Sequence, residues 1–172
     1  FETPAGDIVV CDGYLFDLPA RGAERAPRAR HVATAYAERG DDFLDGLRGG
    51  FFVAIWDRKN ARLVAGRDGM GLHPCYYFWN GRLLLMSSSV DALLAQPEVL
   101  IRPHTARIAE SLICSSFSQH LHETFYREIR RLPPAHRLIV RGATLDVVRY
   151  WNPLPLGFSW ATDDEVEQFE DT

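Results

Sequence analysis

The strongest constraint on the fold is an apolar run in the first half of the chain. Residues 50–56, Gly-Phe-Phe-Val-Ala-Ile-Trp, contain no ionisable side chain. A run of this length and composition is typical of a strand that is buried on both faces. We therefore expect it to form a central strand of a sheet, with its side chains covered on both sides.

The segments after this run predict an antiparallel arrangement. Polar turn residues follow it, and residues 61–66 return as a second strand. Asn80-Gly81, a strong hairpin signal, separates the aromatic segment 75–79 from the apolar segment 83–86. Strands joined by such short connections favour an antiparallel sheet, because parallel strands need long crossovers.

Further short elements are predicted from hydrophobic periodicity and turn residues. The predicted helices cover residues 28–39, 89–96 and 104–114. The predicted strands cover residues 7–11, 14–16, 124–132, 137–140 and 145–150, with Asp12-Gly13 as a turn between the first two.

Two sets of apolar side chains follow from these elements. The strand aromatics Trp56, Tyr76, Tyr77, Phe78 and Trp79 are expected to lie mostly in the core. The helix predicted at 104–114 has an apolar stripe formed by Ile108, Ala109, Leu112 and Ile113.

Composition and charge narrow the classes of function. The 172 residues are 47% hydrophobic, and 19 basic against 23 acidic residues leave a net charge of −4. Because proteins that grip nucleic acid usually have a basic excess, we expect no nucleic-acid partner. No apolar stretch approaches the roughly 18 residues of a membrane span, and the chain start shows no signal-peptide pattern. We expect a cytoplasmic protein without a membrane partner.

The three cysteines are expected to be reduced. Cys11, Cys75 and Cys114 are widely spaced and show no zinc-ligand spacing. Cys11 and Cys75 fall in predicted strands, where a small buried side chain is a better interpretation than a nucleophile.

Three other motifs have a simple structural interpretation beside a chemical one. The segment Asp68-Gly69-Met70-Gly71 contains Gly-x-Gly but lacks a third glycine, so a turn is favoured over a phosphate cradle. His120 and His122 lack a third ligand, so we expect surface residues and no metal site. Arg67 and Asp68 are interpreted as an internal ion pair that holds a loop, in preference to catalytic residues.

Five motifs occur in an order that carries a resemblance. They are GFFVAIWD at 50–57, LVAGRDGMGLHPCYY at 63–77, LLLMSSSVDALL at 83–94, IRRLPPAH at 129–136 and RYWNP at 149–153. This series resembles the N-terminal glutaminase domain of the asparagine synthase family, a class II glutamine amidotransferase domain. The resemblance extends from about Asp7 to Pro155.

The resemblance implies an α+β fold of the N-terminal nucleophile hydrolase type. Such a fold is a four-layer αββα sandwich of two antiparallel sheets, here expected without its first strands. It also implies a glutaminase-like domain over residues 1–155. Residues 156–172, with Val166 and Phe169 on one helical face, would be a linker and the start of a synthetase domain. In the family that C-terminal domain is the partner and uses ATP and Mg; the glutaminase domain holds no cofactor. A homodimer is a further expectation.

Most of the family's active site is not matched in this chain. The family nucleophile is an N-terminal Cys, whereas residue 1 is Phe1, so no catalytic residue is predicted here. The family's Asn-Gly-Glu motif, whose Asn amide and Gly N–H form the oxyanion hole, aligns with Asp12-Gly13-Tyr14. The family Asp that holds the substrate ammonium aligns with Arg28. A vestigial substrate pocket is therefore expected at four residues: Asp12, Gly13, Tyr14 and Arg28.

The sequence therefore predicts a glutaminase-like domain of an ATP-dependent, amide-forming ligase, inactive toward glutamine and structural in role. Family relatives of the β-lactam synthetase type lack glutaminase activity in the same way. One alternative is an active glutaminase whose Cys-bearing segment is absent from this chain. The other is a stand-alone binding module that re-uses the glutamine pocket.

Overall fold

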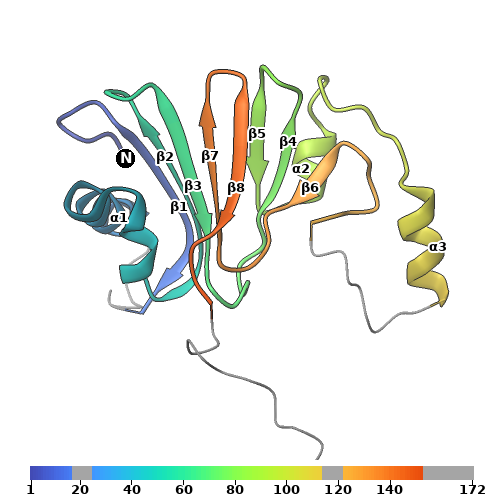
Figure 1. Ribbon diagram of the computed structural model, residues 1–172, viewed down its shortest axis with the longest axis horizontal. Helices are drawn as coiled ribbons and strands as arrows, with labels where there is room; N and C mark the ends of the chain where they lie inside the picture. Colours follow the sequence, from blue (N-terminus) through green and yellow to red (C-terminus); the bar gives the residue numbers. More distant parts are fainter. Residues whose placement is uncertain (17–24, 114–121, 153–172) are drawn as a thin grey trace, which may run out of the picture.

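The computed structural model describes residues 1–16, 25–113 and 122–152, which form two β-sheets flanked by helices (Figure 1). The helices are α1 (Arg25–Arg39), α2 (Val90–Leu94), α3 (Thr105–Ile113) and the 3₁₀ helix η1 (Gly40–Gly46). The strands are β1 (Ile8–Leu15), β2 (Gly49–Asp57), β3 (Arg62–Arg67), β4 (Tyr76–Trp79), β5 (Leu84–Ser87), β6 (Ile129–Arg131), β7 (His136–Arg141) and β8 (Thr144–Arg149).

Neighbouring strands pair antiparallel throughout both sheets. One sheet has the order β1-β2-β3-β7-β8, and the other has the order β5-β4-β6. Helix α1 packs against the larger sheet and α2 against the smaller one, so the layers run helix, sheet, sheet, helix (Figure 1). This arrangement confirms the predicted αββα sandwich.

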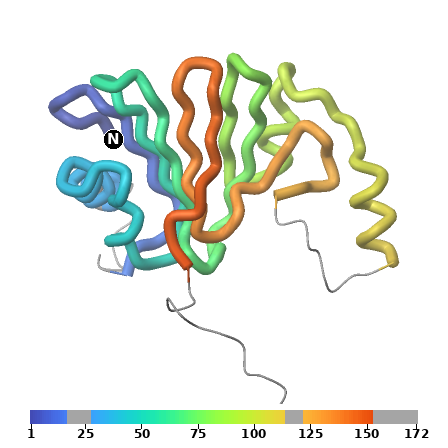
Figure 2. Tube along the Cα trace, viewed as in Figure 1, coloured from blue at the N-terminus to red at the C-terminus, as the bar shows by residue number. Residues whose placement is uncertain are grey.

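The chain ahead of β1 folds back along that strand (Figure 2). Glu2 pairs with Ile8 in an antiparallel bridge. Phe1 and Val9 exchange two hydrogen bonds, at 2.7 and 3.0 Å. This short hairpin covers the first residues of the outer edge of β1.

Strand β2 confirms the prediction of a buried central strand. It lies between β1 and β3, and residues 51–53 and Ile55 are buried. Trp56 is 41% exposed, however, so the prediction that this aromatic lies in the core is wrong. It pairs across the sheet with Ile8, which is 51% exposed, so both side chains lie at an uncovered corner of the sheet.

The Asn80-Gly81 hairpin is also confirmed, because it joins the antiparallel strands β4 and β5. Gly81 has a φ of +89°, and the Asn80 side-chain oxygen accepts the Leu83 N–H at 2.9 Å. Asn and Gly suit these places because one side chain closes the turn and the other residue tolerates a positive φ.

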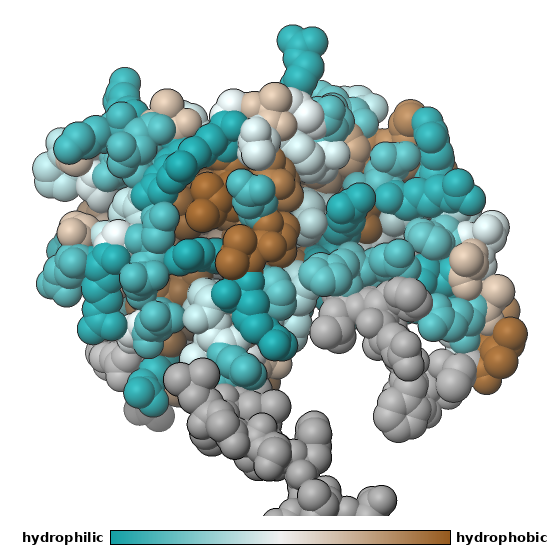
Figure 3. Space-filling view, in the orientation of Figure 1, coloured by the Kyte–Doolittle hydropathy of each residue, from teal (hydrophilic) through white to brown (hydrophobic). Residues whose placement is uncertain are grey.

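The core between the sheets is built from side chains of both. Its buried members are Phe52, Ala65, Cys75, Tyr77, Leu132 and Leu138. In the space-filling view, hydrophobic residues reach the surface over the β7–β8 hairpin, bordered by hydrophilic ones (Figure 3). Strand β8 is the edge strand of its sheet. Val140, Leu145 and Val147, on β7 and β8, pack against this core and are only partly buried.

The expected turn at Asp12-Gly13 is not a turn, because β1 runs unbroken from Ile8 to Leu15 beside β2. Gly13 has a φ of +100°, and a Cβ on it would lie 2.2 Å from the Gly50 carbonyl oxygen. The glycine that was expected to end a strand is therefore needed for close approach of two strands.

Helix α3 forms where it was predicted, but part of its apolar stripe is exposed. Leu112 is 82% exposed and Ile113 is 87% exposed, whereas Arg107 is buried. In the ribbon view α3 lies to one side of both sheets (Figure 1), and these two side chains of its apolar stripe are left uncovered by the described residues.

The predicted strand at 124–132 is shorter than expected. Only Ile129–Arg131 is a strand, because the Thr124 hydroxyl donates to the carbonyls of Tyr126 and Ile129 and bends the chain before it. The tail prediction for residues 156–172 lies outside the described residues. In the described ranges, none of the helices combines the length and apolar character of a membrane span.

Candidate functional site

Three of the four predicted pocket residues meet at the outer edge of β1. The Gly13 N–H donates to Asp12 Oδ1 at 3.1 Å. Arg28 Nη1, from the first turns of α1, donates to the Gly13 carbonyl oxygen. Both backbone groups of Gly13 are therefore bonded to side chains of this chain.

Two further polar side chains lie beside Asp12. His73 Nε2 lies 3.1 Å from Asp12 Oδ2, and Ser88 is the second neighbour of this carboxylate. The interaction with His73, helped by that with Ser88, holds the pKa of Asp12 below its usual 3.8. Asp12 is thus an anion at neutral pH, and its side chain is 41% exposed.

Tyr14, the fourth predicted residue, has a different place. A Cβ on Gly50 would lie 2.9 Å from the Tyr14 ring, so this ring covers the backbone of β2. Its centroid lies 5.4 Å from that of Phe16. Tyr14 packs along the strand and does not join Asp12 in the groove described next.

A groove of about 430 Å³ runs beside Asp12. It is lined by Phe1, Val9, Val10, Cys11, Asp12, Ala29, Phe52, Ser87 and Ser88. Among these described residues, Asp12 is the one Asp, Glu, Lys or Arg side chain. The groove therefore has mainly apolar walls, two hydroxyl groups and a single carboxylate.

The loop that carries His73 is fixed by Asp68, whose exposed fraction is 0%. Its carboxylate accepts the backbone N–H groups of Leu72 at 2.8 Å, His73 at 2.9 Å and Phe51 at 3.3 Å. Because an ionised carboxylate can accept about four hydrogen bonds, one side chain holds the loop and β2 together.

Arg67 holds the same loop from its carbonyl side. It donates to the carbonyl oxygens of Gly71 and His73, both at 2.6 Å, and of Leu132 at 2.9 Å. The two residues hold the loop as predicted, but each bonds to the backbone and not to the other. Asp68 accepts from backbone N–H groups, and Arg67 donates to backbone carbonyl oxygens. Gly71 has a φ of +68°, which supports the simple turn predicted for the Gly-x-Gly motif.

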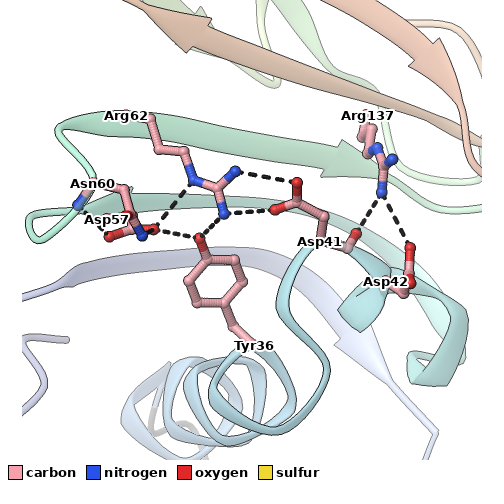
Figure 4. Close-up of polar contacts among 7 residues, drawn as sticks. All are labelled: Tyr36, Asp41, Asp42, Asp57, Asn60, Arg62 and Arg137. Atoms are coloured by element: carbon pink, nitrogen blue, oxygen red, sulfur yellow. Dashed lines mark hydrogen bonds and ion pairs between the residues drawn. The ribbon is translucent and has the colours of Figure 1, made fainter.

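A polar network that the sequence did not predict ties α1 to the sheet (Figure 4). The Tyr36 hydroxyl donates to Asp57 at 2.7 Å and accepts from Arg62 at 2.8 Å. Arg62 also contacts Asp57 at 3.1 Å and Asp41 at 2.6 Å. Burial, with the hydrogen bond to Asp57, raises the pKa of Tyr36 to about 12. The network fixes the helix whose first turns carry Arg28.

The cysteine and histidine predictions can be examined in part. Cys11 and Cys75 are free and buried, and burial raises the pKa of their thiols to about 11 and about 12. Neither is activated as a nucleophile. Cys75 lies just before β4 and not in a strand, whereas Cys114 and His120 lie outside the described residues. In the described part of the chain, no three metal-ligating side chains come together.

Comparison with known proteins identifies the family. Residues 29–151 match a model described as a glutamine amidotransferase domain, which is well over half of the chain. The chain belongs to this glutamine amidotransferase family. Several of its relatives are asparagine synthetases, as the motif order predicted.

The relatives of this amidotransferase domain are much longer proteins. Glutamine-hydrolysing asparagine synthetase 3 of Bacillus subtilis is 30% identical over 97% of this chain and 26% of its own length. Amidase chyE of Penicillium rubens is 30% identical over 92% of this chain and 25% of its own. The chain thus spans about a quarter of these relatives.

Solved amidotransferase structures support the fold. Glutamine PRPP amidotransferase from B. subtilis superposes with a TM-score of 0.52 at 13% identity, covering 88% of this chain and 31% of that one. A structure described as the allosteric regulatory enzyme of purine biosynthesis has a TM-score of 0.51 at 12% identity. At this identity the likeness concerns the fold alone.

Proposed function

We propose that this chain is the glutamine amidotransferase-like domain of an ATP-dependent, amide-forming enzyme, and that it no longer hydrolyses glutamine. Its remaining role is structural: it supports the part of the enzyme that forms the amide. ATP and Mg act in that part, and the nitrogen comes from free ammonia or from an amine of the substrate.

The observation that carries the proposal is the bonding of Gly13. An oxyanion hole needs N–H donors that point at the oxygen on which negative charge develops. Here the Gly13 N–H is already bonded to Asp12 Oδ1. Asp12 replaces the family's amide donor with an acceptor, and its negative charge opposes an oxyanion. Loss of one such donor typically lowers the rate about 10²- to 10³-fold.

Arg28 supports the same conclusion from the substrate side. The family resemblance puts a carboxylate here to hold the ammonium group of glutamine. A guanidinium carries the opposite charge, and in this structure it is bonded to the carbonyl oxygen of Gly13. A glutamine ammonium at this place would face a cation.

The decisive experiment measures glutamate release from glutamine by the full-length protein. We expect turnover far below the roughly 1–10³ per second of ordinary enzymes. The double variant Asp12→Asn/Arg28→Asp restores the family's residues and should raise glutamate release if a nucleophile is present. A matched control, Asp146→Asn/Arg82→Asp, makes the same changes at exposed positions and should have no effect.

The outcomes separate the alternatives. Wild-type turnover in the ordinary range would contradict the proposal and support an active glutaminase. Amide formation from ammonia in the full-length protein, without glutamine use, would support the proposed structural role. Absence of any amide-forming activity with ATP would favour the stand-alone binding module.

A further inference from the structure

The loop between β3 and β4 turns its charged side chains inward and apolar ones outward. Arg67 and Asp68 are 7% and 0% exposed, and both bond to backbone groups of the loop. Met70 and Leu72 are 69% and 59% exposed, although burial of such side chains is favourable. An ordinary surface loop has the opposite arrangement, with its polar residues in water.

Trp151 extends this apolar surface from a distant part of the chain. A Cβ on Gly69 would lie 2.8 Å from the Trp151 ring, so the ring packs on the loop backbone. Strands β3 and β8 both end at this end of the sheet, because each pairs antiparallel with β7 (Figure 1). Met70, Leu72 and Trp151 are called the end surface below. Isolated exposed apolar residues are ordinary, whereas several on neighbouring backbone mark an interaction site.

The backbone under the end surface is fixed by hydrogen bonds. The Gly71 N–H donates to the Asp68 carbonyl oxygen at 3.1 Å, in addition to the bonds of the Arg67 and Asp68 side chains. The Tyr150 hydroxyl donates to the Arg67 carbonyl oxygen at 2.8 Å and so places the residue before Trp151. Because this backbone is already ordered, a partner that packs on it loses little entropy in ordering the loop.

The position of the end surface in the chain indicates what covers it. The structure describes the chain as far as Asn152, directly after Trp151. This chain spans 26% of one relative, so in a protein of that length the part that follows is tethered at the end surface. Tethering gives that part a high effective concentration, and a small apolar surface then suffices for contact. Methionine and tryptophan are also enriched in protein interfaces.

We propose that the end surface is the contact on which the amide-forming part of the same polypeptide packs, and that Met70 is buried in this contact. The inference rests on the proposed function, which gives the protein such a part. It deepens that function by naming the surface through which the domain supports its partner.

Oxidation of methionine by hydrogen peroxide measures whether Met70 is covered. The full-length protein and the 172-residue chain are oxidised in parallel, and the rate at each methionine is followed by mass spectrometry. Met70 should react at least about tenfold more slowly in the full-length protein, since a covered side chain reacts only when its contact opens. Met86, which packs against the core between the sheets, is the internal control and should react equally in both.

A charge placed in the end surface should open the contact. In full-length Leu72→Asp, Met70 should oxidise at nearly its rate in the 172-residue chain. Leu100→Asp makes the same change at a leucine that is 52% exposed and outside the end surface, so Met70 should stay protected. In the 172-residue chain both variants should unfold at the wild-type urea concentration, because both side chains are exposed. If Leu72→Asp folds poorly, the comparison of the two wild-type proteins still decides.

Equal oxidation of Met70 in the full-length protein and the 172-residue chain would overturn the inference. Slow oxidation of Met70 in the 172-residue chain would overturn it too, because residues of the chain itself or a second copy would then cover the end surface. Protection of Met70 that persists in full-length Leu72→Asp would also contradict it. Glutamate release and amide formation by the same full-length preparation decide the proposed function separately, so either claim can fail alone.

Discussion

Replacing Asp68 by alanine tests the claim that one buried carboxylate holds the loop that carries His73. The change removes the acceptor of three backbone N–H groups, at 2.8, 2.9 and 3.3 Å. It also removes the negative charge beside Arg67, which is 7% exposed and whose pKa is already lowered by burial.

The magnitude follows from these contacts. A hydrogen bond to a charged group contributes about 1.5–3 kcal/mol, and a buried donor left without a partner costs about 1–3 kcal/mol. Because water can enter the space left by the side chain, the losses of the three hydrogen bonds do not simply add. We expect Asp68→Ala to lower the free energy of unfolding by about 4–6 kcal/mol, a large share of the about 5–15 kcal/mol of a typical domain.

Urea unfolding of the chain gives the free energy and its slope m. Asp68→Asn keeps the shape and one acceptor oxygen, so its loss should be intermediate, about 2 kcal/mol. Asp146→Ala, at an exposed position, should stay within about 0.5 kcal/mol of the wild type. A loss below about 1 kcal/mol for Asp68→Ala would show that Arg67 alone fixes the loop.

Three further predictions concern the strand edge and the network that supports it. Tyr36→Phe removes a hydroxyl with two buried partners, so unfolding experiments should show a loss of about 1–3 kcal/mol; no loss would mean that α1 is held by apolar packing alone. Gly13→Ala combines a φ of +100° with a Cβ 2.2 Å from a backbone oxygen, so it should destabilise by more than about 1 kcal/mol, and a neutral effect would contradict this geometry. The lowered pKa of Asp12 stabilises the fold above the usual carboxyl pKa of 3.8, and this contribution is lost as the pH falls through the lower folded value. The stability difference between wild type and Asp12→Asn should therefore shrink below about pH 4, and a constant difference down to pH 2 would contradict the contacts of Asp12 with His73 and Ser88.

Local sequence patterns predicted the strands well. The run at 50–56 and the Asn80-Gly81 turn specify their structure through nearby residues, so strand burial and hairpin register follow from them. The family resemblance supplied the αββα architecture, which periodicity does not determine. The apolar stripe of α3 shows what such patterns do not predict. Periodicity indicates an amphipathic helix, but it does not say which surface, if any, packs against the apolar face.

The site was predicted as a set of positions but not as a set of contacts. Arg28 aligned with a substrate-binding residue, yet its bond to the Gly13 carbonyl depends on how α1 meets the edge of β1. Tyr36, Asp57 and Arg62 lie 5 to 26 residues apart and become partners only through the packing of α1 on the sheet. Asp12-Gly13 looked like a turn because its residues are turn formers, whereas pairing with β2 keeps it extended.

The central claim is that the pocket no longer accepts glutamine, and equilibrium binding tests it without need of a nucleophile. L-glutamine is titrated into the full-length protein in a calorimeter, with Asp12→Asn/Arg28→Asp measured in parallel. The account predicts no saturable binding by the wild type, with any dissociation constant above about 10 mM, outside the roughly 1 μM–1 mM at which enzymes commonly half-saturate. Wild-type binding of glutamine within that range, unchanged in the double variant, would contradict it.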